Sequence, residues 1–289
     1  MRDKTLGYLL VLPAVVMLLA ITLVPTIYSY YFSVHDVRVQ TFRNPPFVGL
    51  ENYAWVLSNN EFWLSLRFTV LFTAAVGSVE LLLGILIAVL FDRPIRGRRL
   101  FIAIILIPLG IAPALFSIMM KQMVNEFAGL IPYVLRSIGI QFSFFKDFPS
   151  TFMTIALTDI IEWVPFVFII VFAALQALPR EPFEAAVIDG ASSWLVFKDI
   201  TIPLLRPVLA VVIILRFMDA FKIFEVINIM TRGGPGMSTE SISYFIYQLS
   251  WAGGYNNYGW AAAATIIVFY MVTIGAGVGL YVLRRMKVI

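Results

Sequence analysis

Six long stretches of mostly apolar residues dominate this 289-residue sequence. A helix needs about 20 mostly apolar residues to cross the hydrocarbon core of a bilayer. The stretches lie near residues 6–32, 64–91, 100–120, 151–178, 207–230 and 259–283. Hydrophobic residues make up 61% of the chain and charged residues 13%, whereas soluble domains have about 45–50% and about 25%. The sequence therefore predicts an all-α integral membrane protein, with residues 1–289 forming a single transmembrane domain of six helices.

Basic residues near the ends of the stretches predict the orientation, because cytoplasmic loops carry an excess of Lys and Arg. Twelve lie on one side and seven on the other. The twelve are Arg2, Lys4, Arg93, Arg96, Arg98, Arg99, Arg180, Lys198, Arg206, Arg284, Arg285 and Lys287, and the seven are Arg38, Arg43, Arg67, Lys121, Arg136, Lys146 and Arg232. We therefore expect both termini and residues 179–206 to be cytoplasmic. Residues 33–63, 121–150 and 231–258 are expected outside.

The sequence contains no motif typical of catalysis, nucleotide binding or metal binding. There is no Cys, so disulfides and thiolate metal sites are excluded. No G-x-x-x-x-G-K-[ST] loop is present to bind ATP phosphates, and no nucleophile or metalloprotease motif occurs. The single histidine, His35, has no cluster of metal-ligating residues around it in the sequence. We expect a non-catalytic chain that binds no metal or cofactor.

The cytoplasmic segment 179–206 has helical signals of its own. Pro182 suits the first helical position, Glu181 and Glu184 favour a helix N-terminus, and Gly190 can adopt the left-handed conformation that stops a helix. These signals predict a helix of one to two turns. From the residues alone, an amphipathic hairpin on the membrane surface and a docking surface for another protein are equally good interpretations.

A second helix is predicted in the same segment. Ser192 can cap its N-terminus. Its apolar residues recur at spacing three, at Trp194, Phe197 and Ile200. Pro203 and Pro207 are expected to end this helix before the fifth stretch.

Ionisable residues inside the apolar stretches mark a second candidate site, because a charge at bilayer depth costs about 2.5–3.5 kcal/mol on insertion scales unless it is paired or faces water. The fourth stretch carries Asp159, Glu162 and Trp163 on one helical face. Pro165 is expected to kink the helix beside them. Glu80, in the second stretch, is expected to make a structural hydrogen bond.

The fifth stretch carries a polar residue at every third position. The series is Arg216, Asp219, Lys222, Glu225 and Asn228. On a regular helix this series spirals, so it cannot all face one narrow cavity. Two interpretations remain open. Lys222 forms salt bridges with Asp219 and Glu225 that brace the bundle, or Phe221, Lys222 and Glu225 help to line a hydrophilic pathway.

Residues 184–191, Glu-Ala-Ala-Val-Ile-Asp-Gly-Ala, followed by Ile200, Ile202 and Pro203, resemble the EAA loop of permease subunits in binding-protein-dependent ABC importers. Two further segments resemble the carbohydrate branch of that family, similar to the maltose and glycerol-phosphate permeases. These are Phe-Val-Gly-Leu-Glu-Asn-Tyr at 47–53 and Thr-Arg-Gly-Gly-Pro-Gly-Met-Ser-Thr at 231–239. The resemblance covers the chain from residue 47 to its end and implies a type I importer permease fold.

In that family the EAA segment forms a coupling helix, here between the fourth and fifth stretches, that docks into an ATPase subunit. The resemblance implies coupling roles for Glu184, Ala185, Ala186, Asp189, Gly190, Ala191, Phe197 and Pro203. Implied partners are a second permease, two ATPase subunits that carry ATP and Mg²⁺, and an external solute-binding protein, but no nucleic acid. The implied location is the prokaryotic plasma (inner) membrane.

The resemblance also implies that residues before the Thr-Arg-Gly-Gly-Pro run contribute to a carbohydrate cavity. The candidate pathway residues are Asp159, Glu162, Trp163, Asp219, Phe221, Lys222, Glu225 and Asn228. Relatives often have an amide where this chain has Lys222, so the identity of the solute does not transfer. The alternative from another class is a self-sufficient secondary transporter or channel that uses the charges of the fourth and fifth stretches. An EAA loop argues against it, because such a protein needs no cytoplasmic ATPase dock.

Overall fold

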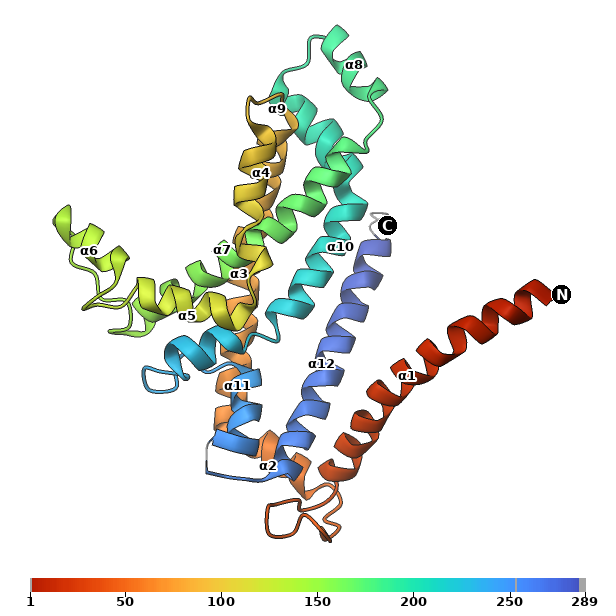
Figure 1. Ribbon diagram of the computed structural model, residues 1–289, viewed down its shortest axis with the longest axis vertical. Coiled ribbons are helices and arrows are strands. Elements are labelled where there is room, and N and C mark those ends of the chain that lie inside the picture. The colour runs from red at the N-terminus through yellow and green to blue at the C-terminus, as the bar shows by residue number, and fades with distance from the viewer. Residues whose placement is uncertain (1, 253, 286–289) are drawn as a thin grey trace. The chain divides into compact units, whose positions relative to one another are not determined.

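The computed structural model describes residues 2–252 and 254–285, and this part is helical without β-strands (Figure 1). The α-helices are α1 (Arg2–Ser33), α2 (Glu51–Ser58), α3 (Asn60–Asp92), α4 (Arg98–Leu106), α5 (Pro113–Met123), α6 (Leu130–Ser137), α7 (Phe148–Gln176), α8 (Glu181–Ile188), α9 (Ser193–Val196), α10 (Ile202–Ala220), α11 (Ile242–Tyr247) and α12 (Tyr258–Arg285). A 3₁₀ turn, η1 (Pro108–Gly110), and three π-helical turns, η2 (Phe197–Thr201), η3 (Ile227–Thr231) and η4 (Gln248–Ala252), complete the described elements. The predicted all-α class is confirmed.

Five helical segments of the described chain are long and apolar enough to cross a membrane. They are Tyr8–Ser33, Asn60–Asp92, Phe148–Gln176, Ser193–Ala220 and Tyr258–Tyr281. Each overlaps one of the apolar stretches in the sequence. The third stretch has no counterpart among these five segments.

The prediction of an unbroken helix over residues 100–120 is wrong. This stretch contains α4, η1 and α5, and neither α-helix is long enough to span a membrane alone. The break follows from the prolines, because Pro108 and Pro113 lack a backbone N–H and disfavour helical geometry in the residue before them. Ala112, immediately before Pro113, is extended at φ −60° and ψ 136°. A count of six spans therefore stays a prediction.

The fifth predicted span also needs two corrections. Pro203 and Pro207 do not end a helix, because α9, η2 and α10 follow one another without a break. In η2 the backbone is wider, with the N–H of Ile202 bonded to the carbonyl of Phe197. This wider turn accommodates the ring of Pro203. At its other end α10 stops at Ala220, well before residue 230.

The chain divides into two compact units, the first of which comprises Met1–Trp63 and Phe245–Thr273. The side chain of Asn52 joins its helices, because its Nδ2 donates to the carbonyls of Ser33 and His35 at 2.9 Å each. Gly259, at the start of α12, allows the close approach, since a Cβ there would lie 2.5 Å from the carbonyl oxygen of His35. The ends of α1, α2 and α12 therefore meet at Asn52.

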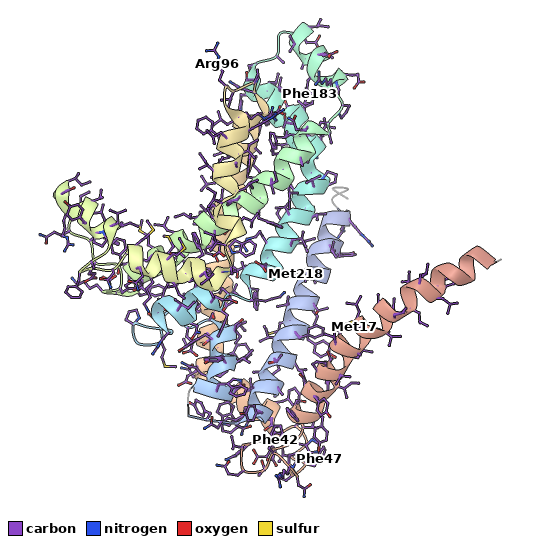
Figure 2. All side chains as sticks on the ribbon, viewed as in Figure 1. Met17, Phe42, Phe47, Arg96, Phe183 and Met218 are labelled. Atoms are coloured by element: carbon purple, nitrogen blue, oxygen red, sulfur yellow. The ribbon has the colours of Figure 1, made fainter. Side chains whose placement is uncertain are left out.

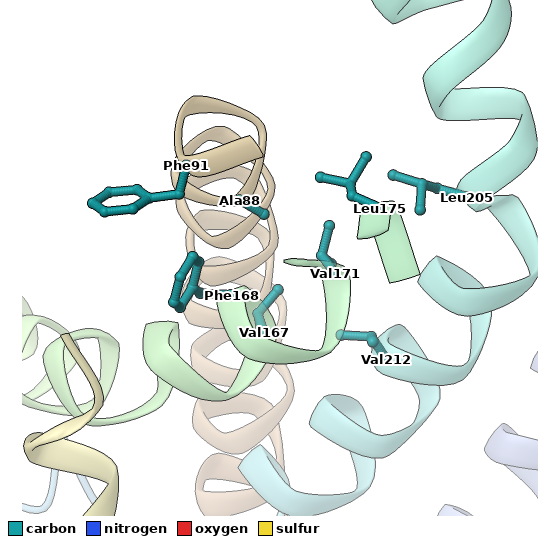
Figure 3. Packing of buried hydrophobic residues seen from close by; sticks show 8 residues of the cluster. All are labelled: Ala88, Phe91, Val167, Phe168, Val171, Leu175, Leu205 and Val212. Atoms are coloured by element: carbon teal, nitrogen blue, oxygen red, sulfur yellow. The ribbon is translucent and has the colours of Figure 1, made fainter. Parts of the chain in front are cut away.

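The second unit comprises Leu64–Tyr244 and Ile274–Ile289. Its apolar core lies between α3, α7 and α10 (Figure 3). The buried members of this core are Ala88, Phe91, Val167, Phe168, Val171, Leu175, Leu205 and Val212. α3 and α7 approach each other most closely at Gly84, where an added Cβ would lie 2.5 Å from Val167 Cγ1. Small residues permit this kind of contact between spanning helices.

Candidate functional site

Three spans of the second unit meet at the side chain of Arg216 on α10, which is only 2% exposed. Its Nε and Nη2 donate to the two carboxylate oxygens of Glu80 on α3, at 2.5 and 2.8 Å. Nη2 also donates to Asp159 Oδ2 on α7 at 2.8 Å, and Nη1 donates to Asp219 Oδ2 on α10 at 2.9 Å. We call these four residues the Arg216 cluster. A guanidinium suits it, because its rigid fork of five donors binds carboxylates bidentately.

Burial differs strongly among the three carboxylates of the Arg216 cluster. Glu80 is fully buried and the Asp159 side chain is 6% exposed, whereas the Asp219 side chain is 48% exposed. Removing a charge from water costs several kcal/mol unless an opposite charge and hydrogen bonds compensate for it. Glu80 and Asp159 therefore depend on Arg216, and Asp219 depends on it much less.

Trp163 and Glu162, both on α7, extend the Arg216 cluster. The Arg216 Cζ lies 4.8 Å from the centroid of the Trp163 ring, which is a cation–π contact. Glu162 is also buried, and its Oε2 has no hydrogen-bond partner among the described residues. A buried carboxylate oxygen without a donor can accept a hydrogen bond from a hydroxyl group. The structure thus brings the predicted Asp159, Glu162 and Trp163 together with Asp219.

The other candidate pathway residues lie beyond the end of α10. The backbone turns at Phe221 and Lys222, where the N–H of Lys222 donates to the carbonyl of Asp219 at 2.9 Å. Because of this turn, the polar series does not continue along one regular helix. Phe221 is buried, Asn228 is half-buried, and Lys222 and Glu225 are exposed.

The predicted salt bridges of Lys222 are not formed. Among the described residues, neither Lys222 nor Glu225 takes part in a salt bridge, and Asp219 pairs with Arg216 instead. Bracing of the bundle therefore comes from the Arg216 cluster. The sequence showed one part of this arrangement, a single glutamate at position 80 in the second apolar stretch, but no pattern that identified its partner.

A second candidate site is α8, which joins α7 to α9 and lies beyond the ends of α4, α7 and α10 (Figure 1). As predicted, Gly190 adopts φ +71° just after the helix, whereas Pro182 is the second helical residue and not the first, because α8 begins at Glu181. Ser192 then caps α9 through a hydrogen bond from the N–H of Leu195 at 3.3 Å. Figure 2 shows Phe183 of α8 above the spans.

The faces of α8 differ in exposure. Ala186 is buried, whereas Glu184 and Ala185 are exposed. Val187 and Ile188 are 75% and 86% exposed. Of the other predicted coupling residues, Asp189 and Gly190 are exposed, and Ala191, Phe197 and Pro203 are half-buried.

An open cleft of about 700 Å³ separates α8 from the ends of α3 and α7. α8 contributes Phe183, Glu184, Val187 and Ile188 to its lining. The opposite wall is polar at Asp92, whose carboxylate accepts a hydrogen bond from Gln176 at 2.5 Å. α8 is therefore held apart from the spans, with charged and apolar side chains on its accessible surface.

In the second unit, three packed spans with a short helix beyond their ends form the arrangement expected of an importer permease. Residues 80–288 match the family model described as "Binding-protein-dependent transport system inner membrane component". Because the match covers more than half of the sequence, the chain belongs to this family of ABC importer permeases. The matched range includes the Arg216 cluster and α8.

Curated relatives are similar along most of the chain. The trehalose/maltose transport system permease protein MalF of Thermococcus litoralis is 38% identical over 94% of this chain and 91% of its own length. The sn-glycerol-3-phosphate transport system permease protein UgpA of Agrobacterium fabrum is 30% identical over 93% and 92%. The trehalose transport system permease protein SugA of Mycobacterium tuberculosis H37Rv is 28% identical over 95% and 87%.

Solved structures share the fold. A bacterial ABC transporter involved in the import of the acidic polysaccharide alginate matches with a TM-score of 0.86 and 20% identity, over 98% of this chain and 96% of that chain. The same transporter in complex with a periplasmic protein bound to an alginate pentasaccharide matches with the same TM-score over 99% and 96%. At this identity the likeness shows the fold, which is that of a type I importer permease.

Proposed function

We propose that this chain forms half of the translocation pathway of an ATP-driven sugar importer and receives energy from ATPase subunits through α8. The observation that carries the proposal is α8 itself, an exposed helix outside the spans whose sequence resembles the EAA loop. Its partners are then a second permease, two ATPase subunits with ATP and Mg²⁺, and an external solute-binding protein. This chain supplies no catalytic group, and both of its termini are cytoplasmic.

The surface of α8 suits docking into a protein groove. Ala185 presents a small side chain, so that a partner backbone can approach closely, and Val187 and Ile188 offer apolar contacts. Glu184 is exposed and makes no salt bridge within the described part of the chain. It is therefore available to pair with a basic residue of the ATPase. Gly190 sets the angle at which the chain leaves the helix.

The connections of α8 suit the transmission of force. Four residues, 177–180, join α7 to α8, and on the other side α9, η2 and α10 are continuous. Closure of two ATPase subunits around ATP would pull the two docked loops together. The spans attached to each loop would then rock between inward-facing and outward-facing arrangements.

The assignment of a sugar rests on the relatives and on the side chains of the pathway. Three of the relatives are permeases of trehalose, trehalose/maltose or glycerol-phosphate systems. Glu162, Lys222, Glu225 and Asn228 provide acceptors and donors for hydroxyl groups, and Trp163 provides an aromatic ring. Asp159 and Asp219 act mainly through the Arg216 cluster.

A secondary transporter or channel is less well supported. It would use the charges of α7 and α10 to move ions, but Asp159 and Asp219 are bound to Arg216. It would also leave the exposed α8 without a role.

The test is ATP hydrolysis by the reconstituted complex. Glu184→Lys and Gly190→Asp are expected to leave the chain inserted and assembled but to abolish hydrolysis stimulated by the loaded binding protein. Glu181→Lys is the matched control, because Glu181 lies in the same first turn of α8 but outside the EAA run, and we expect near-normal stimulation. Normal stimulation in both Glu184→Lys and Gly190→Asp would overturn the proposal.

A further inference from the structure

The connection between α5 and α7 carries an apolar face that nothing in the described chain covers. α6 contributes Leu130, Tyr133 and Val134, the preceding turn contributes Phe127, and the following residue is Ile138. Their exposed fractions run from 48% at Val134 to 94% at Phe127. Within α6, Tyr133 and Val134 lie three and four residues after Leu130, so these three side chains share one face.

The turn before α6 is fixed by its own hydrogen bonds and by a close backbone contact. Asn125 Oδ1 accepts hydrogen bonds from the N–H groups of Phe127 and Ala128, at 3.0 and 3.1 Å. The N–H of Gly129 donates to the carbonyl of Asn125 at 2.8 Å. A Cβ on Gly129 would lie 2.5 Å from the carbonyl oxygens of Met123 and Asn125, so only glycine fits. The direction of α6 relative to α5 is therefore set by the chain itself.

The segment after α6 is held in place as well. Phe144 is buried, and its carbonyl accepts a hydrogen bond from Thr154 Oγ1 of α7 at 3.1 Å. Ser143 donates to Glu126, which ties the two ends of the connection together. On α6, Pro132 is buried on the side away from the apolar face. The exposed apolar side chains are thus held outward by a structure that is fixed on its other side.

The continuity of this face with α5 points to lipid. α5 exposes Leu115, Ile118 and Met119, which belong to the third apolar stretch of the sequence. α6 has eight residues, about 12 Å in length, and cannot span a bilayer. A short helix that follows an exposed apolar surface of this kind fits the membrane interface, where its apolar face reaches the boundary of the acyl chains.

Charge and aromatic content agree with an interfacial position. Arg136 is exposed beside the apolar face, and Lys146 is exposed in the same connection. Both are cations that can pair with lipid phosphates. Tyr133 has a ring with a polar tip, the type of side chain that is enriched at headgroup level.

A transient protein partner suits this face less well. The solute-binding protein of an importer must leave after delivery, and its departure would expose several large apolar side chains to water. Such exposure costs about 25 cal/mol per Å² of apolar surface. Lipid is present throughout the cycle. We propose that α6 is an interfacial helix that lies in the outer leaflet with its apolar face among phospholipid acyl chains.

The sequence offers a clean test, because the chain contains no Cys. In the complete transporter with Cys-free partners, Val134→Cys is spin-labelled and reconstituted into phosphatidylethanolamine–phosphatidylglycerol vesicles. Accessibility to oxygen and to a water-soluble nickel chelate is then measured. Leu82→Cys on the exposed surface of α3 is the lipid reference, and Asn44→Cys in a polar external loop is the water reference.

We expect the ratio of oxygen to nickel accessibility at Val134 to be several-fold higher than at Asn44 and to approach that at Leu82, with a mobile spectrum. Nickel accessibility at Val134 equal to that at Asn44 would overturn the proposal. If this nickel accessibility then fell when the solute-binding protein was added, the apolar face would be assigned to that partner. An immobilised spectrum with low accessibility to both reagents would also overturn it, in favour of a contact with the second permease.

Discussion

Replacing Arg216 by Met removes the cation that three carboxylates share, while keeping a side chain of similar length. In the folded chain Glu80 would then be left fully buried without its two hydrogen bonds from Arg216, and Asp159 would lose its bond to Nη2. Trp163 would lose its cation–π contact. The substitution therefore tests whether α3, α7 and α10 are held together by charge.

The expected loss for Arg216→Met is about 3–5 kcal/mol of unfolding free energy, the cost of breaking a buried ion pair by removing one partner. Asp219→Asn should cost only about 0.2–1 kcal/mol, because that side chain is 48% exposed. Glu80→Gln should lie between them at about 1–3 kcal/mol, since Arg216 keeps Asp159 and Asp219 as partners while losing one charged acceptor.

Unfolding by SDS in mixed micelles, followed by the fluorescence of the six tryptophans, gives these free energies for the purified subunit. Arg216→Lys serves as the control that keeps the charge but loses the bidentate geometry, and it should recover only part of the stability. A loss below about 1 kcal/mol for Arg216→Met, the level of a surface ion pair, would refute the reasoning. A loss of unfolding free energy for Asp219→Asn equal to that for Arg216→Met would refute the conclusion that burial decides how strongly each carboxylate depends on Arg216.

Three further variants test other parts of the structure. Gly84→Ala should cost about 1–3 kcal/mol because its Cβ would lie 2.5 Å from Val167 Cγ1, and Gly77→Ala, which has free space, is the control in the same unfolding assay. Lys222→Ala should alter uptake of the cognate solute while leaving assembly and basal ATP hydrolysis unchanged; normal uptake would show that Lys222 is dispensable in the pathway. Asp147 caps α7, and the hydrogen bond that its carboxylate accepts from the backbone N–H of Ser150 lowers its pKa from the ordinary 3.8. Its contribution to stability is therefore complete above the ordinary pKa and is lost as pH falls through the lowered one, so the melting-temperature difference between wild type and Asp147→Ala should shrink in that acidic range.

Local signals in the sequence predicted much of the local structure of segment 179–206. Gly190 and Ser192 each act on the backbone within a few residues and have the predicted roles in the structure, and Pro182 lies one position later in the helix than predicted. The prediction for Pro203 was wrong because the local rule that proline ends a helix has an exception. A π-helical turn accommodates the ring of Pro203 and lets the helix continue, and no pattern in the sequence predicted this turn.

The break in the third apolar stretch was visible in principle. Pro108, Gly110 and Pro113 lie inside it, but the length of the apolar run outweighed them in the prediction. Length and hydropathy report that a segment can be in a membrane. They do not report whether one helix crosses it, because partners can satisfy the backbone groups that a break exposes.

The partner of Glu80 was beyond sequence reasoning for a different reason. Arg216 is 136 residues away along the chain, so no periodic pattern relates the two. The predicted pairs within the fifth stretch were sequence neighbours, and they failed because α10 ends before Lys222. Only the packing of α3 against α10 decides which carboxylate the guanidinium meets.

The Arg216 cluster also constrains how the spans would move under the force that we propose α8 transmits. One flank of α8 leads to α7, which carries Asp159, and the other leads to α10, which carries Arg216. If α8 moved α10 without α3, the bonds between Arg216 and Glu80 would break at a cost of about 3–5 kcal/mol. We therefore expect α3, α7 and α10 to move as one body, with the Arg216–Glu80 distances unchanged in inward-facing and outward-facing structures of the transporter. Structures of the two states in which the guanidinium had exchanged Glu80 for another carboxylate would contradict this and make the cluster a switch.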